Sequence, residues 1–157
     1  MGIGVRLGDM AMGAADQGQG EQARRILYHG RIQHGVQFLS PERRRIPTAY
    51  YGRNSGAGLL LQALAGRPRR VALIGMGIGT LAAYGEPGDL YRFYEINTLV
   101  AQVARESFFY LRDSRAHVEI EIGDGRLGLE KAPQDQPFDA ILVDAFSGDA
   151  IPNHLIT

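Results

Sequence analysis

Three closely spaced glycines, Gly75, Gly77 and Gly79, have the spacing that most directly suggests ligand chemistry. They follow the continuous apolar run 70–75 and precede a segment that can open a helix. Glycine lets the backbone turn tightly and approach a ligand closely, and a helix N-terminus offers free N–H groups. The same triplet also suits a tight strand-to-helix turn without a ligand. The glycines alone therefore leave both interpretations open.

An acidic residue strengthens the ligand-binding interpretation. Glu95 lies 20 residues after Gly75, at the end of the next predicted strand, where a carboxylate can accept hydrogen bonds from both ribose hydroxyls. Thr80 stands where a G-x-G-x-x-G dinucleotide loop has its last glycine. This favours an S-adenosyl ligand over NAD without excluding NAD, and the charge of Glu95 disfavours the 2′-phosphate of NADP.

Three aspartates follow the later predicted strands. Asp124, between Gly123 and Gly125, could accept a hydrogen bond from an adenine amino group, although its spacing alone favours simple turn chemistry. Asp144 ends a long apolar run, and a carboxylate at the tip of a buried strand is costly unless it binds something, which favours a functional role. Asp149 could act at the same site or cap a helix.

The elements that must position these residues alternate between strands and helices. A helix capped by Ser55 is expected to end near Gly66, because glycine and Pro68 terminate it. Strands are predicted at 70–75, 90–95, from 117 and at 138–146, and helices at 79–84, 98–111 and 126–132. This alternation predicts an α/β protein with a doubly wound parallel sheet of the Rossmann type.

The N-terminal part, before residue 55, lacks this alternation of strands and helices. Residues 1–24 are rich in Gly, Ala and Gln without a sustained period and are predicted to form a mobile leader. Residues 26–39 alternate apolar and polar side chains and predict a β-hairpin, followed by loop. The predicted units are thus a leader at 1–24, a small strand and loop segment covering the site at 25–54, and a Rossmann-like nucleoside-binding domain at 55–157.

The end of the chain suggests that this domain is incomplete. Pro152 suits the first turn of a helix that has only just begun, and sheets of this kind normally continue beyond four strands. The sequence therefore predicts a domain truncated after its fourth strand, which would leave an apolar edge prone to self-pairing.

Composition excludes several functional classes. The 17 basic and 17 acidic residues balance, which argues against nonspecific nucleic-acid binding. The chain has no cysteine, and its four histidines lack metal-ligand spacing, so no metal site is predicted. No apolar run approaches the roughly 18 residues of a membrane span and no signal peptide is visible, so a cytoplasmic location is expected. The run Arg43 to Arg45 reads as a solvated loop rather than a phosphate patch.

Six blocks, in order along residues 25–157, resemble the spermidine synthase-like domain of bacterial polyamine aminopropyltransferases, some of which are fused to membrane-spanning segments. The blocks are RILYHGRIQHGVQF, TAYYG, the Gly75 to Gly79 loop, YEIN, GDGRL and VDAFSGDAIPNHLIT. The resemblance implies a class I S-adenosylmethionine-type Rossmann domain preceded by a small β-strand domain. It also implies a transferase of polyamine biosynthesis, a small-molecule amine substrate and a homo-oligomer, with a membrane-spanning region in a longer parent protein as a further option.

The resemblance also implies roles for single residues. In the nucleoside site, Glu95 would hold the ribose, Asp124 with Gly125 would contact the adenine, and Gln33 of the hairpin's G-x-x-Q would contact the nucleoside, beside the loop glycines Gly75, Gly77 and Gly79. In the amine site, Asp144 matches the amine-activating aspartate, and Tyr50 or Tyr51 falls near a tyrosine of the pocket. The expected catalytic set is Asp144, with Asp149 as helper and Tyr51 as a hydrogen-bonding wall.

The sequence departs from the family mainly at the amine-binding positions. The glycine loop carries Met76 and Ile78 where true spermidine synthases have an aspartate, and Asn97 stands where they have a second acid. The loop after the fourth strand reads Asp-Ala-Phe-Ser-Gly-Asp in place of D-S-S-D. The S-adenosyl ligand is therefore better supported than the polyamine substrate.

Three functions remain open from the sequence. The first is transfer of an aminopropyl group from decarboxylated S-adenosylmethionine to an amine. The second is an S-adenosylmethionine-dependent methyltransferase acting on a small molecule, because the same sulfonium chemistry serves both. The third is a non-catalytic nucleoside-binding domain. A NAD-dependent enzyme is disfavoured by Thr80 and by the upstream hairpin.

Overall fold

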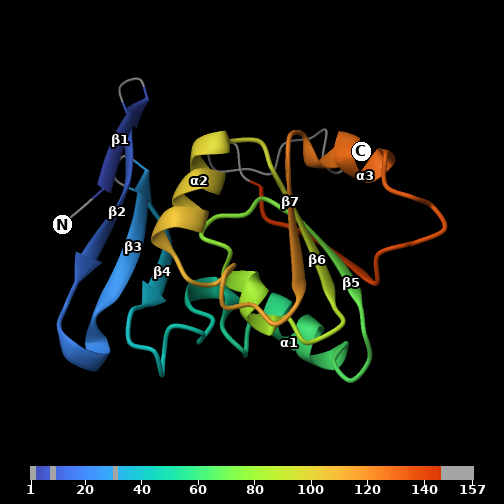
Figure 1. Ribbon diagram of the computed structural model, residues 1–157, viewed down its shortest axis with the longest axis horizontal. Helices are drawn as coiled ribbons and strands as arrows, with labels where there is room; N and C mark the ends of the chain where they lie inside the picture. The colour runs from blue at the N-terminus through green and yellow to red at the C-terminus, as the bar shows by residue number, and fades with distance from the viewer. Residues whose placement is uncertain (1–2, 8–9, 30–31, 146–157) are drawn as a thin grey trace.

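The chain folds around two sheets of different kinds. The computed structural model describes residues 3–7, 10–29 and 32–145, and the side chains of 12–28 and 33–145. An antiparallel sheet in the order β1-β2-β3-β4 precedes a parallel sheet in the order β7-β6-β5-β8. Figure 1 shows the antiparallel sheet on one side of the molecule, with α2 between it and the parallel sheet. Asp149 and Pro152 lie outside the described residues.

The parallel sheet has the predicted doubly wound topology. Its strands are β5 (Arg70–Ile74), β6 (Leu90–Glu95), β7 (His117–Ile122) and β8 (Ala140–Val143). From β5 the chain first builds β6 and β7 on one side and then crosses over to place β8 on the other. The order reverses between β5 and β8, and ligands bind at the carboxyl ends of the strands beside such a switch point.

Short helices and 3-10 turns lie between strands of both sheets. They are α1 (Gly56–Ala63), α2 (Thr98–Ser107) and α3 (Gly125–Glu130), with 3-10 turns η1 (Gly20–Gln22), η2 (Ala49–Tyr51) and η3 (Thr80–Tyr84). The Ser55 cap of α1 is confirmed, since its hydroxyl accepts a hydrogen bond from the Gly58 N–H at 3.0 Å. Within the described part of the chain, no helix is long and apolar enough to cross a membrane.

Two helix predictions were inaccurate in extent. The helix predicted at 98–111 ends at Ser107, because Phe108 is extended and its ring is buried in the cluster beneath the antiparallel sheet. The segment predicted as a helix at 79–84 forms the 3-10 turn η3. In both places, tertiary packing overrides local helical spacing.

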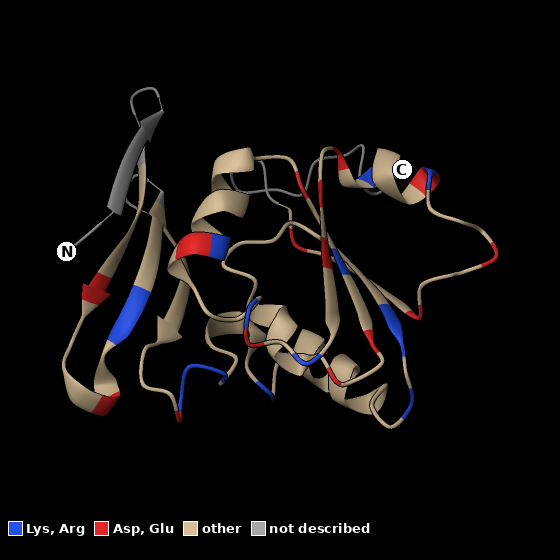
Figure 2. Cartoon of the chain, viewed as in Figure 1, with Lys and Arg blue, Asp and Glu red and all other residues tan. Residues whose placement is uncertain are grey.

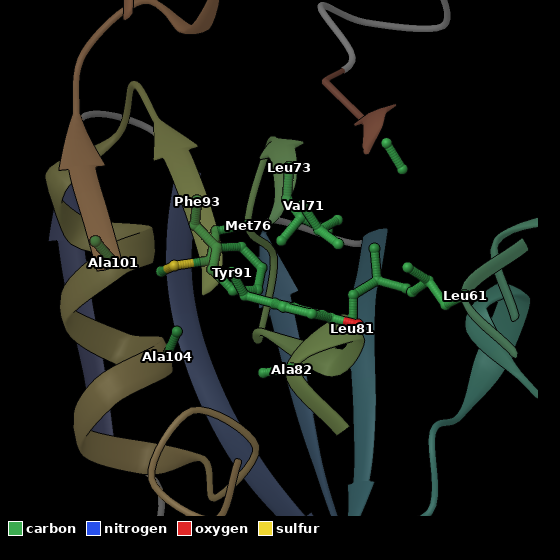
Figure 3. Packing of buried hydrophobic residues seen from close by; sticks show 11 residues of the cluster. Leu61, Val71, Leu73, Met76, Leu81, Ala82, Tyr91, Phe93, Ala101 and Ala104 are labelled. Atoms are coloured by element: carbon green, nitrogen blue, oxygen red, sulfur yellow. The ribbon is translucent and has the colours of Figure 1, made fainter. Parts of the chain in front are cut away.

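The main core lies on one face of β5 and β6. Val71 and Leu73 of β5 pack with Tyr91 and Phe93 of β6, and all four side chains are at most 1% exposed. Figure 3 shows this cluster between the sheet, η3 and α2. Alternate residues of β5 pack on the opposite face, where Ala72 and Ile74 join Tyr94. Burial on both faces explains why β5 is a continuous apolar run.

The predicted leader at 1–24 is wrong for the residues that the structure describes. Strands β1 (Ile3–Leu7) and β2 (Met10–Gln17) pair with each other, and β2 also pairs with β3 (Arg24–His29). The predicted boundary at 24/25 thus falls inside one sheet. Met12 and Ala14 are buried against a cluster that includes Val103 of α2. The sequence did not reveal β2 as a strand, because it contains several Gly and Ala residues, which are uncommon in strands.

The hairpin predicted at 26–39 is present as β3 and β4 (Ile32–Phe38). It is fastened to the second unit by polar contacts that span long sequence separations. The Arg25 guanidinium donates to the Ser107 carbonyl at 2.7 Å. The fully buried Gln37 donates to the Arg44 carbonyl at 2.7 Å and accepts from the Phe109 N–H at 2.8 Å. These bonds hold the antiparallel sheet against the end of α2.

Candidate functional site

The glycine loop after β5 has the conformation that its composition predicts. Gly75, Gly77 and Gly79 have φ angles of 86°, 51° and 79°, a region that residues with side chains rarely adopt. The Gly79 N–H donates to the Met76 carbonyl at 2.9 Å and closes the turn that leads into η3. Substitution with larger residues would strain this backbone, so the glycines are required by the turn itself.

Glu95 ties this loop to the end of β6. Its side chain is 7% exposed, and its two carboxylate oxygens accept hydrogen bonds from the Met76 N–H at 3.0 Å and the Asn97 N–H at 2.8 Å. Each carboxylate oxygen can accept a second hydrogen bond, so both retain capacity for a ligand. Glu95, the residue predicted to bind the ribose, therefore also holds the glycine loop in its conformation.

Asp144 lies directly beside the same loop. Its N–H donates to the Ile74 carbonyl at 2.8 Å as β8 ends. A Cβ added to Gly75 would overlap the Asp144 carbonyl, so only glycine allows the two strand ends to approach this closely. The topology thus brings together Gly75 and Asp144, which are far apart in the sequence, across the switch point between β5 and β8.

The Asp144 carboxyl is half-buried, and removal from water raises its pKa from the ordinary 3.8 to about 6. Within the described residues, no hydrogen bond or ion pair to this carboxylate offsets the loss of hydration. The pKa of the Tyr50 phenol is also raised, first by burial and then by the charge of Asp144. Tyr50 and Asp144 therefore share one electrostatic environment.

The two tyrosines of η2 have different surroundings. Tyr50 is 60% exposed and follows Ala49, whose φ of 54° lies in the left-handed region. Tyr51 packs against the main core, and its carbonyl accepts a hydrogen bond from the Tyr84 hydroxyl at 2.7 Å. Of the two candidate tyrosines, Tyr50 is the one whose phenol interacts with the charge of Asp144, while the role of Tyr51 as a hydrogen-bonding wall stays a prediction.

Asp124 caps helix α3. Its Oδ1 accepts a hydrogen bond from the Leu127 N–H at 3.1 Å, so the turn chemistry suggested by its spacing is present. The adjoining Gly125 is buried, and a Cβ there would lie 2.6 Å from Cγ2 of Ile74 in β5. This close approach seats the start of α3 against the sheet, beside the candidate site. The adenine contact of Asp124 and Gly125 stays a prediction.

Exposed apolar side chains flank these polar groups. Ile96 is 75% exposed, Leu127 52% and Ile122 46%, and all three lie at or just after the carboxyl ends of β6 and β7. The sequence analysis did not single them out. An isoleucine directly after a strand-ending acid was the available indication, because a buried strand normally ends in polar loop. These side chains offer an apolar surface beside Glu95 and Asp124.

Strand β4 approaches the glycine loop from the antiparallel sheet. A Cβ added to Gly35 would lie 2.8 Å from Cγ1 of Ile78, and one added to Gly77 would lie 3.8 Å from the His34 carbonyl oxygen. Gln33 is exposed and pairs with Tyr28 of β3, whereas Gly35 pairs with Leu27, so the register shift between the two pairs breaks the simple alternation of faces along β4. The hairpin is therefore adjacent to the loop, and the nucleoside contact of Gln33 stays a prediction.

Among the described residues, no group of three His, Asp or Glu side chains is arranged so that it could hold a metal ion.

Comparison with known proteins was made by sequence and by structure. No family model matches the chain. A polyamine aminopropyltransferase from Vibrio vulnificus is 35% identical over 125 residues, which cover 77% of this chain and 40% of that protein. A probable spermidine synthase from Corynebacterium glutamicum superposes with a TM-score of 0.73 at 20% identity, over 99% of this chain and 56% of that one.

Two further solved structures share the fold. The spermidine synthase from Thermotoga maritima has a TM-score of 0.58 at 17% identity and matches 99% of this chain and 49% of its own. A spermidine synthase in complex with the transition-state analogue AdoDATO has a TM-score of 0.60 at 17% identity, over 99% of this chain and 50% of its own. The chain thus spans about half the length of these proteins or less. The resemblance to spermidine synthase-like domains is confirmed, including the antiparallel strands before the Rossmann sheet.

Proposed function

We propose that this chain carries the donor-binding half of the active site of an enzyme that transfers an aminopropyl group from decarboxylated S-adenosylmethionine to an amine. The observation that carries the proposal is the meeting of the glycine loop, Glu95 and Asp144 at the carboxyl ends of three neighbouring strands. The similarity to a polyamine aminopropyltransferase supports it.

The reaction asks for little covalent chemistry from the protein. The nitrogen of a neutral amine attacks the carbon attached to the sulfonium, so a C–N bond forms while the C–S bond breaks. The sulfur leaves as a neutral thioether and needs no acid. The product ammonium must release one proton. Catalysis therefore depends on holding the two substrates in line and on providing a proton acceptor.

Asp144 is suited to act as that acceptor. With a pKa near 6, it is largely ionised at neutral pH, yet it is more basic than an ordinary aspartate. Its carboxylate would also attract the protonated amine and orient it before proton loss. The nearby Tyr50 phenol would form one wall of the amine site, with Tyr51 behind it. Asp149 would assist from the following loop.

The nucleoside part of the donor would lie across the ends of β5, β6 and β7. Glu95 would accept hydrogen bonds from the ribose hydroxyls with the lone pairs that its two backbone donors leave free. The adenine would pack against Ile96 and Leu127 and meet Asp124 and Gly125 at the start of α3. The glycine loop would lie against the nucleoside, and Gln33 would approach from β4.

Calorimetric titration with methylthioadenosine and S-adenosylhomocysteine tests this proposal. Tighter binding of methylthioadenosine is expected, because it lacks the carboxylate that a decarboxylated donor also lacks. Replacement Glu95→Gln should weaken that binding, whereas Glu106→Gln, an exposed change on α2, should not. A preference for S-adenosylhomocysteine would favour methyl transfer, and binding of neither would contradict nucleoside binding altogether.

Turnover supplies the second test. Decarboxylated S-adenosylmethionine is incubated with a panel of linear diamines and triamines, and the thioether nucleoside is measured chromatographically. Amine-dependent release of methylthioadenosine is expected. Nucleoside binding without any turnover would contradict the assignment of Asp144 as the proton acceptor while leaving the nucleoside site intact.

A further inference from the structure

A cavity of about 180 Å³ lies beside the start of β5, at the other end of this strand from the glycine loop. Its walls come from the loop before α1, from α1 itself, from the residue preceding β5 and from the end of η3. Strand β5 begins beside the cavity and ends at the glycine loop, so its length separates the two places. Figure 1 shows α1 at this lower edge, below the strands, and α3 at the upper edge.

The charged residues that line this cavity are mostly basic. Arg45, Arg53 and Arg69 contribute guanidinium groups, and Glu86 is the acidic residue among the residues that line it. Figure 2 shows blue stretches, which are arginines, along the loop between β4 and α1 near this edge. Whether the cavity attracts an anion depends on which of these charges are already neutralised.

Two of the four charges have partners. The Arg69 Nε donates to Asp89 Oδ2 at 3.0 Å, and its Nη2 donates to the Tyr84 carbonyl at 2.7 Å, in a pair that is almost fully buried. Glu86 is held by Arg115 at 3.0 Å. Arg69 thus forms a neutral wall together with Asp89, and Glu86 does not cancel the charge of the other arginines.

Arg45 and Arg53 carry the remaining charge. Both are exposed, and within the described residues neither side chain forms an ion pair or a hydrogen bond. Charged side chains that line one concave site without carboxylate partners raise the local positive potential, because the low-dielectric walls focus their field. The cavity therefore has two positive charges that nothing in the described chain neutralises.

The neighbours of Arg45 in the arginine run are engaged differently. Arg43 stacks over the Phe38 ring with its guanidinium carbon 3.7 Å from the ring centre, and Arg44 pairs with Asp113 at 2.6 Å. These two arginines are packing residues, in contrast to the solvated loop that the sequence suggested. Arg45 alone of the three lines the cavity.

We propose that this cavity is a second ligand site, which binds a small phosphate monoester. Guanidinium groups match the geometry of phosphate oxygens through paired N–H donors, so Arg45 and Arg53 would bind the phosphate. The side chains of Pro47, Ala83 and Tyr84 provide an apolar wall for a short organic group. The site is independent of the donor site at the carboxyl edge.

Calorimetric titration of the protein with inorganic phosphate and with glycerol phosphate, at physiological ionic strength, tests the proposal. The double variant Arg45→Gln/Arg53→Gln should lose at least about tenfold in affinity for glycerol phosphate, because charge-assisted hydrogen bonds are lost from both arginines. The control Arg105→Gln removes the same kind of charge from the exposed face of α2 and should bind as the wild type does.

The outcomes separate the two ligand sources and the two sites. Tighter binding of glycerol phosphate than of inorganic phosphate supports a contribution from the apolar wall, and equal binding supports a site for phosphate itself. Absence of binding to the wild type, or an equal loss in Arg105→Gln, overturns the proposal. Binding of methylthioadenosine should be unchanged in the double variant, so failure of the donor site would be seen separately.

Discussion

Replacing Asp144 with asparagine should stabilise the fold while removing its chemistry. Asparagine keeps the size of the side chain and removes the charge that burial disfavours. The pKa of Asp144 is about 6 in the folded protein against an ordinary 3.8. A difference of about 2 in pKa corresponds to about 3 kcal/mol. Because the side chain is only half-buried, solvent screening reduces this, and we expect Asp144→Asn to raise the free energy of unfolding by about 1–2 kcal/mol at neutral pH.

The pH dependence has a defined sign. Since the folded pKa of Asp144 lies above the unfolded one, the folded state binds more protons between pH 3.8 and about 6. The wild type therefore loses stability relative to Asp144→Asn as pH rises through this window. The two proteins should be equally stable below it, and the full difference should be present above it.

Urea denaturation followed by circular dichroism, at pH values on both sides of this window, measures the effect. The matched control is Asp135→Asn, which makes the same change at an exposed loop position and should alter stability little at either pH. The reasoning is refuted if Asp144→Asn is no more stable than the wild type at neutral pH. That result would mean that the carboxylate has a compensating partner.

The same variant bears on catalysis. If Asp144 accepts the amine proton, turnover by the wild type should rise with pH through about 6, as its base form appears. Asp144→Asn should lower kcat by roughly 10²–10⁴-fold, the usual contribution of general base catalysis, while methylthioadenosine binding persists. Equal loss of nucleoside binding would instead assign Asp144 to the donor site.

Three further changes test single features of the structure. Glu95→Gln should weaken methylthioadenosine binding by about tenfold, since a charged acceptor is replaced by a neutral one, as titration calorimetry would show. Gly128→Ala should lower stability in urea by about 1–3 kcal/mol, despite the better helix propensity of alanine, because the new Cβ would overlap the Tyr94 ring. Arg69→Met should cost about 3–5 kcal/mol, measured in the same way, because it leaves the Asp89 carboxylate buried without its cation.

The strands of the parallel sheet were predictable because each buried strand is a short, local run of mainly apolar residues. After Arg70, residues 71–74 are apolar throughout, as burial on both faces requires, and they form β5 together with Arg70. The glycine loop and Glu95 were likewise predictable from the sequence, since turn geometry and strand ends leave local residue preferences. The Asp124 cap follows from the same kind of local rule.

Other features depend on partners that lie far along the chain. Strand β2 is built from Gly, Ala and Met and is recognisable only once Met12 and Ala14 pack beneath α2. The end of α2 at Ser107 depends on where the Phe108 ring finds burial, and Gln37 gains its role only when β4 meets the segment after that helix. No local pattern in the sequence records these contacts.

The sequence by itself determined the order of the strands in the Rossmann-like part, the glycine turn and the placement of acidic residues at strand ends, because each follows from local residue preferences and periodic burial. The tertiary structure decided which of these residues meet. Only the crossover that places β8 beside β5 brings Asp144 against Gly75, and only the resulting burial raises its pKa. Likewise, the sequence cannot show that Arg43 stacks on a ring and Arg44 forms an ion pair while Arg45 lines the cavity, because these contacts depend on distances in space and not along the chain.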